Sequence, residues 1–131
     1  MWVANHNRLP THCRLAAWDM SIVKTCLLCD HYDENRDHLF LWCSFSEQVW
    51  TVITRRLGYR PFYLHTWTSL IAWLDARDTM KPFTIRRLAA QATIYSIWIE
   101  RNKRLHNGLS STPPRLCKDI DIKSNLECMC L

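Results

Sequence analysis

The sequence feature that most constrains this chain is a short run of cysteine and histidine residues with the spacing C-x2-C-x8-H-x4-C. Its four members are Cys26, Cys29, His38 and Cys43. Three thiolates and one imidazole form a typical donor set for tetrahedral Zn²⁺. Because the protein would fill all four positions, none would remain for a substrate or an activated water. The spacing therefore predicts one structural zinc ion.

Other interpretations of these side chains remain open. A disulfide between Cys26 and Cys29 would be a redox motif, although the βαβ pattern of thioredoxin-like proteins is missing. Alternatively, the cysteines are ordinary buried side chains, which are common in protein cores. His31 is a spare donor that could bind the metal in place of His38.

Four carboxylates lie in the same loop, and we interpret them as a solvated surface. Two-metal catalysis needs carboxylates that converge from separate elements. Here all four come from one loop segment: Asp30, Asp33, Glu34 and Asp37.

No other group of residues indicates catalysis. His12 and Cys13 are neighbours, but adjacent side chains on a helix point about 100° apart. The two glycines of the chain, Gly58 and Gly108, are too few for a glycine-rich phosphate loop. We therefore expect a protein that is not an enzyme, with no catalytic residues and no small-molecule substrate.

Apolar residues outside the metal loop recur at helical spacing, so we expect an all-α fold with little or no sheet. Thr11 is a candidate cap for a short helix, with Leu15 and Trp18 on its buried side. Ser44 and Glu47 form a capping-box pattern at the start of a helix that follows the metal loop.

Glycine and proline mark the ends of the remaining helices. The helix after the metal loop should end at Gly58, where a C-terminal glycine is expected. Further helices are expected over residues 66–76, residues 84–107 and a short terminal stretch that begins near Pro114. The apolar middle of the longest helix spans only about 18 Å, which is too short to cross a bilayer.

These features divide the chain into three parts. Residues 1–58 are expected to form the zinc-binding domain, residues 59–108 a helical extension, and residues 109–131 a linker with a short terminal helix or tail. Residues 1–9 look like the end of a helix whose beginning is absent, which suggests an N-terminally truncated domain.

The formal net charge of +5 favours contact with a polyanion. Arginine and lysine residues follow the metal helix and recur along the longest helix. Ordinary solvated helix faces are the alternative explanation. The candidate residues for nucleic-acid binding are Arg55, Arg56, Arg60, Arg86, Arg87, Arg101, Lys103 and Arg104.

The joint pattern resembles a known family, the zinc-binding domain downstream of the reverse transcriptase in plant non-LTR (LINE-type) retrotransposons. The likeness covers most of residues 2–107. It is carried by NRLPT at residues 7–11, the four proposed zinc ligands, DHLF at residues 37–40, VW at residues 49–50 and WIERNKR at residues 98–104.

The resemblance implies a nucleic-acid-binding accessory role in element replication, with RNA or DNA as partner. The chain lacks the paired aspartates of a polymerase, because Asp-Asp occurs nowhere in it. A reverse transcriptase or another protein is a further candidate partner. The alternatives are a zinc-stapled protein-interaction module and a non-functional retroelement remnant.

Cysteine usage and the N-terminus favour an intracellular, reducing location, in the nucleus or the cytoplasm. Seven cysteines occur without a recognisable secretory signal in front of them. No apolar run is long enough for a membrane span. The last four residues, from Cys128 to Leu131, formally fit a prenylation pattern, but no polybasic run precedes them.

Overall fold

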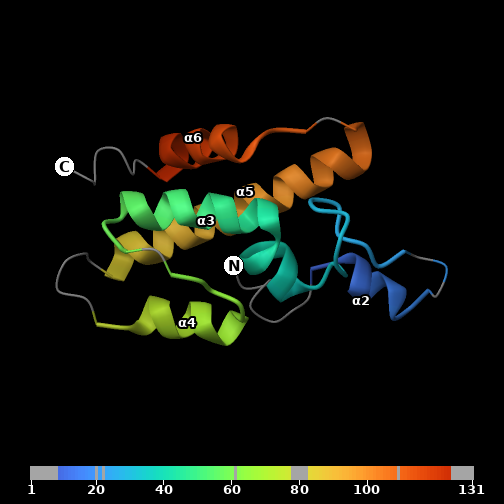
Figure 1. The fold of residues 1–131 in the computed structure, drawn as a ribbon, viewed down its shortest axis with the longest axis horizontal. Coiled ribbons are helices and arrows are strands. Elements are labelled where there is room, and N and C mark those ends of the chain that lie inside the picture. Colours follow the sequence, from blue (N-terminus) through green and yellow to red (C-terminus); the bar gives the residue numbers. More distant parts are fainter. Residues whose placement is uncertain are drawn as a thin grey trace.

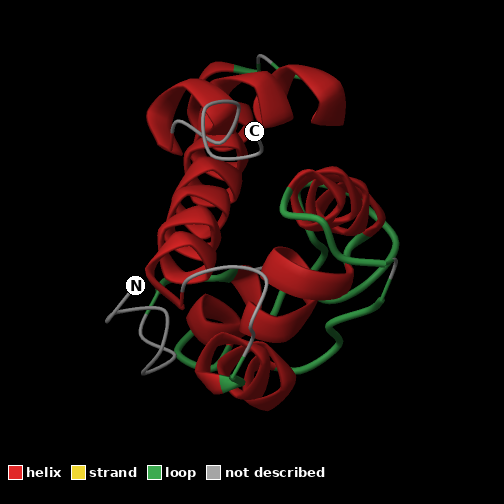
Figure 2. Cartoon of the chain, turned by 90° about the vertical axis from the view of Figure 1, so that its left-hand side faces the viewer, coloured by secondary structure: helices red, strands yellow, loops and turns green. Residues whose placement is uncertain are grey.

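The computed structural model describes residues 9–19, 21, 23–60, 62–77, 83–108 and 110–124 (Figure 1). Within them the chain forms six helices and no β-strand; one isolated antiparallel bridge joins Thr25 and Asp33. Figure 2 accordingly draws only helices and loops. The helices are α2 (His12–Ala16), the π-helix η1 (His38–Trp42), α3 (Ser44–Arg56), α4 (Trp67–Asp75), α5 (Phe83–Asn107) and α6 (Pro113–Ser124).

The long helix α5 is the element on which the others are assembled. It packs against α3, α4, α6 and η1, and α3 also contacts α6 and η1. In Figure 1, α6 and α4 lie on opposite sides of the α3–α5 pair, while α2 and the metal loop occupy the right-hand end. The metal loop is therefore attached to one end of a helical core.

The expected all-α architecture is confirmed, and the predicted helix ends are accurate to within a few residues. The third helix ends at Arg56, and Gly58 beyond it has the positive φ of 91° that glycine tolerates best. At the start of α4 the Thr66 hydroxyl accepts a hydrogen bond from Ser69 N–H. The expected helix end at residues 1–9 lies, apart from Leu9, outside the described residues, and so does the prenylation pattern from Cys128.

Aromatic and aliphatic side chains from all parts of the chain fill one core. Phe40 of η1 lies edge-on to Trp67 of α4, and Trp50 of α3 lies edge-on to Trp73. Side chains of α5 and α6, including Ile97 and Ile120, complete the same buried cluster. The core therefore includes the metal-binding segment, since Cys26 and Cys43 belong to it.

Two predictions about single residues near helix ends were wrong. Trp18 is 72% exposed, because α2 ends at Ala16 and Trp18 lies in the following turn, with the Arg14 guanidinium over its ring. Ser44 is not a cap. The N-cap of α3 is Cys43, with no capping bond from its side chain, and Glu47 N–H donates to Cys43 C=O. The metal loop fixes Cys43 just before the helix, which leaves Ser44 as the first helical residue.

None of the helices in the described part of the chain combines the length and the apolar character needed to span a membrane.

Candidate metal centre

The first two cysteines lie on a tight turn that backbone hydrogen bonds define. Cys26 N–H donates to Tyr32 C=O, and Asp30 N–H donates back to Cys26 C=O. Asp30 has a φ of 58°, a left-handed conformation that aspartate adopts more readily than most residues. Leu28 N–H lies 3.5 Å from Cys26 Sγ. The turn thus directs both sulfurs to one side and gives one of them a backbone donor.

A π-helical turn places the second pair of ligands. In η1 the Cys43 N–H donates to His38 C=O at 2.8 Å, a five-residue step that explains the spacing H-x4-C. Asn35 begins this turn, because its side-chain oxygen accepts a hydrogen bond from His38 N–H. Single π-turns occur often at functional sites. Here the turn brings the imidazole of His38 and the thiol of Cys43 to the same point.

The four predicted ligands converge. One candidate ligand atom from each of Cys26, Cys29, His38 and Cys43 lies within 4.8 Å of the others. Cys26 Sγ and Cys43 Sγ are 3.9 Å apart, and Cys29 Sγ and His38 Nε2 are 3.2 Å apart. Zn–S bonds of ~2.3 Å and Zn–N bonds of ~2.0 Å give tetrahedral edges of about 3.5–3.8 Å. The cluster therefore suits one zinc ion.

Burial and ring packing hold the site in shape. Cys26, Cys43 and His38 are completely buried, and Cys29 is partly buried. The His38 ring lies edge-on to Trp42 with centroids 4.1 Å apart, and Tyr32 packs against both rings. His38 Nδ1 has no hydrogen-bond partner within the described residues. The imidazole is thus oriented by aromatic packing.

A hydrogen bond between Cys26 and Cys43 shifts the pKa values of the two thiols in opposite directions. The hydrogen bond between Cys26 and Cys43 raises the pKa of Cys26, with burial adding to this effect. The same hydrogen bond lowers the pKa of Cys43 against the opposing effect of burial. The Cys26 thiol therefore keeps its proton until a metal ion displaces it.

This protonation pattern predicts that zinc binding strengthens as pH rises. A metal can bind Cys26 only as the thiolate, so binding must release at least the proton that the raised pKa retains. Each proton released should tighten the apparent Kd by about tenfold per pH unit. Competition with a chromogenic chelator across neutral and mildly alkaline pH measures the slope. A pH-independent Kd would show that the thiols are already ionised.

The interpretation of the four acidic residues as a solvated surface was wrong for Glu34. Its side chain is fully buried, whereas Asp30 and Asp33 are exposed and Asp37 is partly buried. The carboxylate accepts hydrogen bonds from His12 N–H at 2.9 Å and Leu27 N–H at 3.1 Å. It also pairs with the guanidinium of Arg101, through Nη2 at 2.8 Å and Nε at 3.1 Å. One side chain thus links α2, the cysteine turn and α5.

A second contact fastens the same turn to α5. Arg104 donates to Leu28 C=O, between the two cysteines, and its guanidinium lies over the Phe45 ring. Its Nε pairs with the buried Glu100, which also accepts from Lys103 and from Ser111 N–H. Burial alone would raise the pKa of Glu100, but these hydrogen bonds outweigh it and lower that pKa. The segment WIERNKR of α5 thus contacts both the metal loop and the linker that precedes α6.

The eight basic residues proposed for nucleic-acid contact fall into two groups. Those on α5 make protein contacts. Arg86 is buried and donates to Trp73 C=O and Ala76 C=O at the end of α4, and Arg87 pairs with Asp75. Arg101 is buried against Glu34, as described above, so a phosphate can reach neither Arg86 nor Arg101 in this fold. Arg55 and Arg60 are exposed and Arg56 is partly exposed.

Within the described residues, the side chains considered for a disulfide, for an alternative zinc ligand and for a Cys–His dyad are not arranged for those roles. Cys26 and Cys29 are free thiols, as are Cys13, Cys43 and Cys117 among the described residues. His31 is exposed and does not belong to the four-residue cluster. His12 Nδ1 lies 2.6 Å from Thr25 C=O, so its ring hydrogen-bonds to the backbone.

A small helical fold with a closed Cys3His centre defines a domain of the structural-zinc class. Residues 1–50, which contain all four ligands, match the model of the family described as zinc-binding in reverse transcriptase. Searches of curated proteins and of solved structures give no match. The contacts from Arg101 and Arg104 come from outside the matched residues.

Proposed function

We propose that this protein is a nucleic-acid-binding accessory domain derived from a retrotransposon reverse transcriptase, of the plant LINE type. The observation that carries the proposal is the closed Cys3His cluster within a match to a zinc-binding family of reverse transcriptase. The zinc ion holds the fold and has no catalytic role, because four protein ligands leave it no open position. Intact thiolates require a reducing compartment, in keeping with an intracellular protein.

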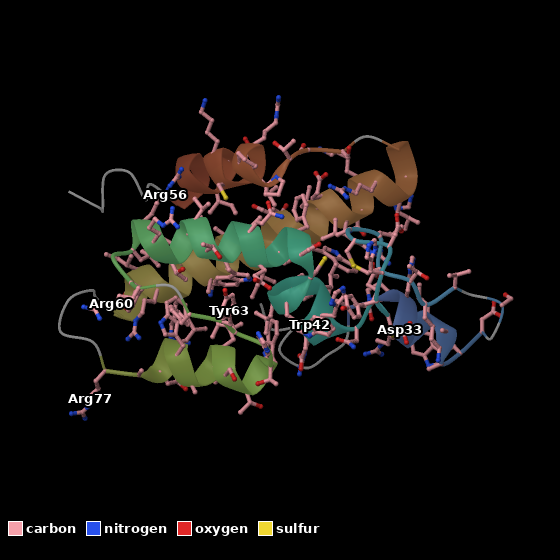
Figure 3. The ribbon with its side chains drawn as sticks, in the orientation of Figure 1. Asp33, Trp42, Arg56, Arg60, Tyr63 and Arg77 are labelled. Atoms are coloured by element: carbon pink, nitrogen blue, oxygen red, sulfur yellow. The ribbon has the colours of Figure 1, made fainter. Side chains whose placement is uncertain are left out.

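Exposed and partly exposed arginines lie at one end of the molecule and support contact with phosphates. We define the arginine end as Arg55, Arg56, Arg60 and Arg77. In Figure 3, Arg56, Arg60 and Arg77 lie at the left-hand end, and Asp33 of the metal loop lies toward the other end. Arg55 and Arg56 are in the last turn of α3, so part of their charge offsets the helix dipole. Arg60 and Arg77 are exposed beyond helix ends and extend the positive surface.

This proposal predicts salt-dependent binding that weakens when the arginine end loses charge. Zinc-loaded protein should bind a single-stranded oligonucleotide with an affinity that falls as salt rises. The double variant Arg55→Gln/Arg60→Gln should flatten the slope of log K against log salt by about 0.7 per lost phosphate contact. Fluorescence anisotropy over a salt series measures both quantities.

The matched control is Arg115→Gln/Lys118→Gln, which removes the same charge from exposed positions on α6. It should leave the slope closer to that of the parent protein. Absence of binding at low salt, or an affinity that ignores salt, would contradict a nucleic-acid function.

A protein-interaction module is the second candidate, because one face of α5 is apolar and exposed. Leu88, Tyr95 and Ile99 are 40%, 57% and 44% exposed. Their spacing of seven and four residues places them on one side of the helix. Light scattering and binding of a hydrophobic dye test this idea. A monomer that binds no dye would contradict it, and Tyr95→Lys should abolish any association that is seen.

A further inference from the structure

A polar hollow of about 390 Å³ opens beside the metal centre. Two separate parts of the chain line it, namely the segment that enters and forms η1 and the residues just before α4. Trp42, which Figure 3 labels, is the aromatic member that also packs on the metal ligand His38. Pockets for small organic ligands measure about 300–1,000 Å³, so one planar heterocycle fits. The lining residues are Asn35, Arg36, Asp37, Trp42, His65 and Thr66.

The aromatic groups at the hollow suit a flat ligand. Trp42 is held by edge-on contacts with His38 and with Tyr32, at centroid distances of 4.1 Å and 5.1 Å. Tyr32 is itself 58% exposed beside it. The guanidinium carbon of Arg36 lies over the Trp67 ring, 4.8 Å from the ring centre. Rings and guanidinium planes that are already fixed in place lose little entropy when a base stacks on them.

The charges in the hollow favour a neutral ligand over a free anion. Arg36 Nε pairs with Asp37 Oδ1 at 3.1 Å, so the two formal charges in the lining offset each other. The remaining polar groups can donate and accept hydrogen bonds. Asn35 uses its side-chain oxygen for His38 N–H and can offer its amide N–H groups, and the His65 imidazole is exposed. This combination matches the hydrogen-bonding edge of a nucleobase.

We infer that the hollow is a binding site for one unpaired nucleobase of a nucleic-acid strand. The inference rests on the proposed function and adds the kind of nucleic acid that is bound, a single strand or an unpaired position. A base inside a duplex would first have to leave its stack and its pair, which costs free energy that an unpaired base does not spend. The hollow therefore selects unpaired bases, while basic residues elsewhere contact the phosphates.

The test compares two probes of equal charge on the zinc-loaded full chain. One is a thymidine 12-mer, and the other is a 12-mer of abasic tetrahydrofuran units with the same phosphates. The thymidine strand should bind about tenfold tighter, as expected for stacking of one base. His65→Ala should reduce this ratio to near one, and Trp42→Leu should do the same provided that metal analysis shows retained zinc. His106→Ala, an exposed histidine outside the hollow, should preserve the ratio.

Crosslinking locates the base independently. A strand carrying 4-thiothymidine, irradiated and digested, should give adducts on the peptide that contains Trp42 or the peptide that contains His65. Equal, salt-dependent affinity for both probes would overturn the hollow as a base site and leave the proposed function standing. The hollow is equally overturned if His65→Ala keeps the full ratio or if the adducts map elsewhere. If neither probe binds at low salt, the proposed function fails as well.

Discussion

Replacing Cys43 by serine is expected to release the zinc and to unfold most of the domain. Structural zinc sites in small peptides have apparent binding free energies of about 10–16 kcal/mol. The whole stability of a domain is only about 5–15 kcal/mol, so loss of the metal leaves little net stability. Cys43 is completely buried, belongs to the hydrophobic core and is also the N-cap of α3, so the effect should spread into the helices.

Metal analysis and thermal unfolding followed by circular dichroism would measure this result. Treatment of the parent protein with a strong chelator should produce the same unfolded state as the variant. Cys13→Ser is the control, because Cys13 is only partly buried and lies outside the ligand cluster. A Cys43→Ser protein that keeps a full equivalent of zinc and the parent melting temperature would contradict the assignment of this ligand.

The metal centre could be predicted from the sequence because its geometry is set by residues that are close together in the chain. Cys26 and Cys29 are brought together by one turn, and His38 and Cys43 by one turn of π-helix, so the spacing alone carries the geometry. The end of α3 near Gly58 and the start of α4 at Thr66 could be predicted for the same reason, because each depends on a few neighbouring backbone groups. Features that are fixed within a few residues can be read from a single sequence.

The roles of the charged residues were not predictable, because they depend on contacts between distant segments. Glu34 has the same sequence environment as the exposed Asp33, yet it meets Arg101 from far along the chain. Arg86 was expected on the surface, but it is buried and donates hydrogen bonds to backbone carbonyl groups at the end of α4. The one usable signal was the resemblance of residues 98–104 to a family pattern. Glu100, Arg101 and Asn102 lie within the long helix that packs on the other helices, where polar side chains suggest buried hydrogen bonds as readily as a charged surface.

Breaking the Glu34–Arg101 pair is the second change with a large expected effect. The two side chains are 0% and 3% exposed, so solvent screens the pair little. Removing one partner of a buried pair costs about 3–5 kcal/mol, because the other charge stays buried without compensation. Glu34→Ala should therefore cost this much in urea unfolding of the zinc-loaded protein. Asp75→Asn, which breaks a pair that is largely exposed, should cost less than about 1 kcal/mol.

The same change should also weaken zinc binding, since Glu34 accepts the Leu27 N–H inside the cysteine turn. Loss of a group that orients a metal site typically lowers affinity by about 10–100-fold. If the two side chains act as a pair, Glu34→Gln and Arg101→Gln together should cost about 0.5–3 kcal/mol less than the sum of the single changes. Strict additivity would mean that each side chain acts alone. In that case α5 would not hold the metal loop through this pair, and the tie between the two would rest on Arg104 and its hydrogen bond to Leu28 C=O.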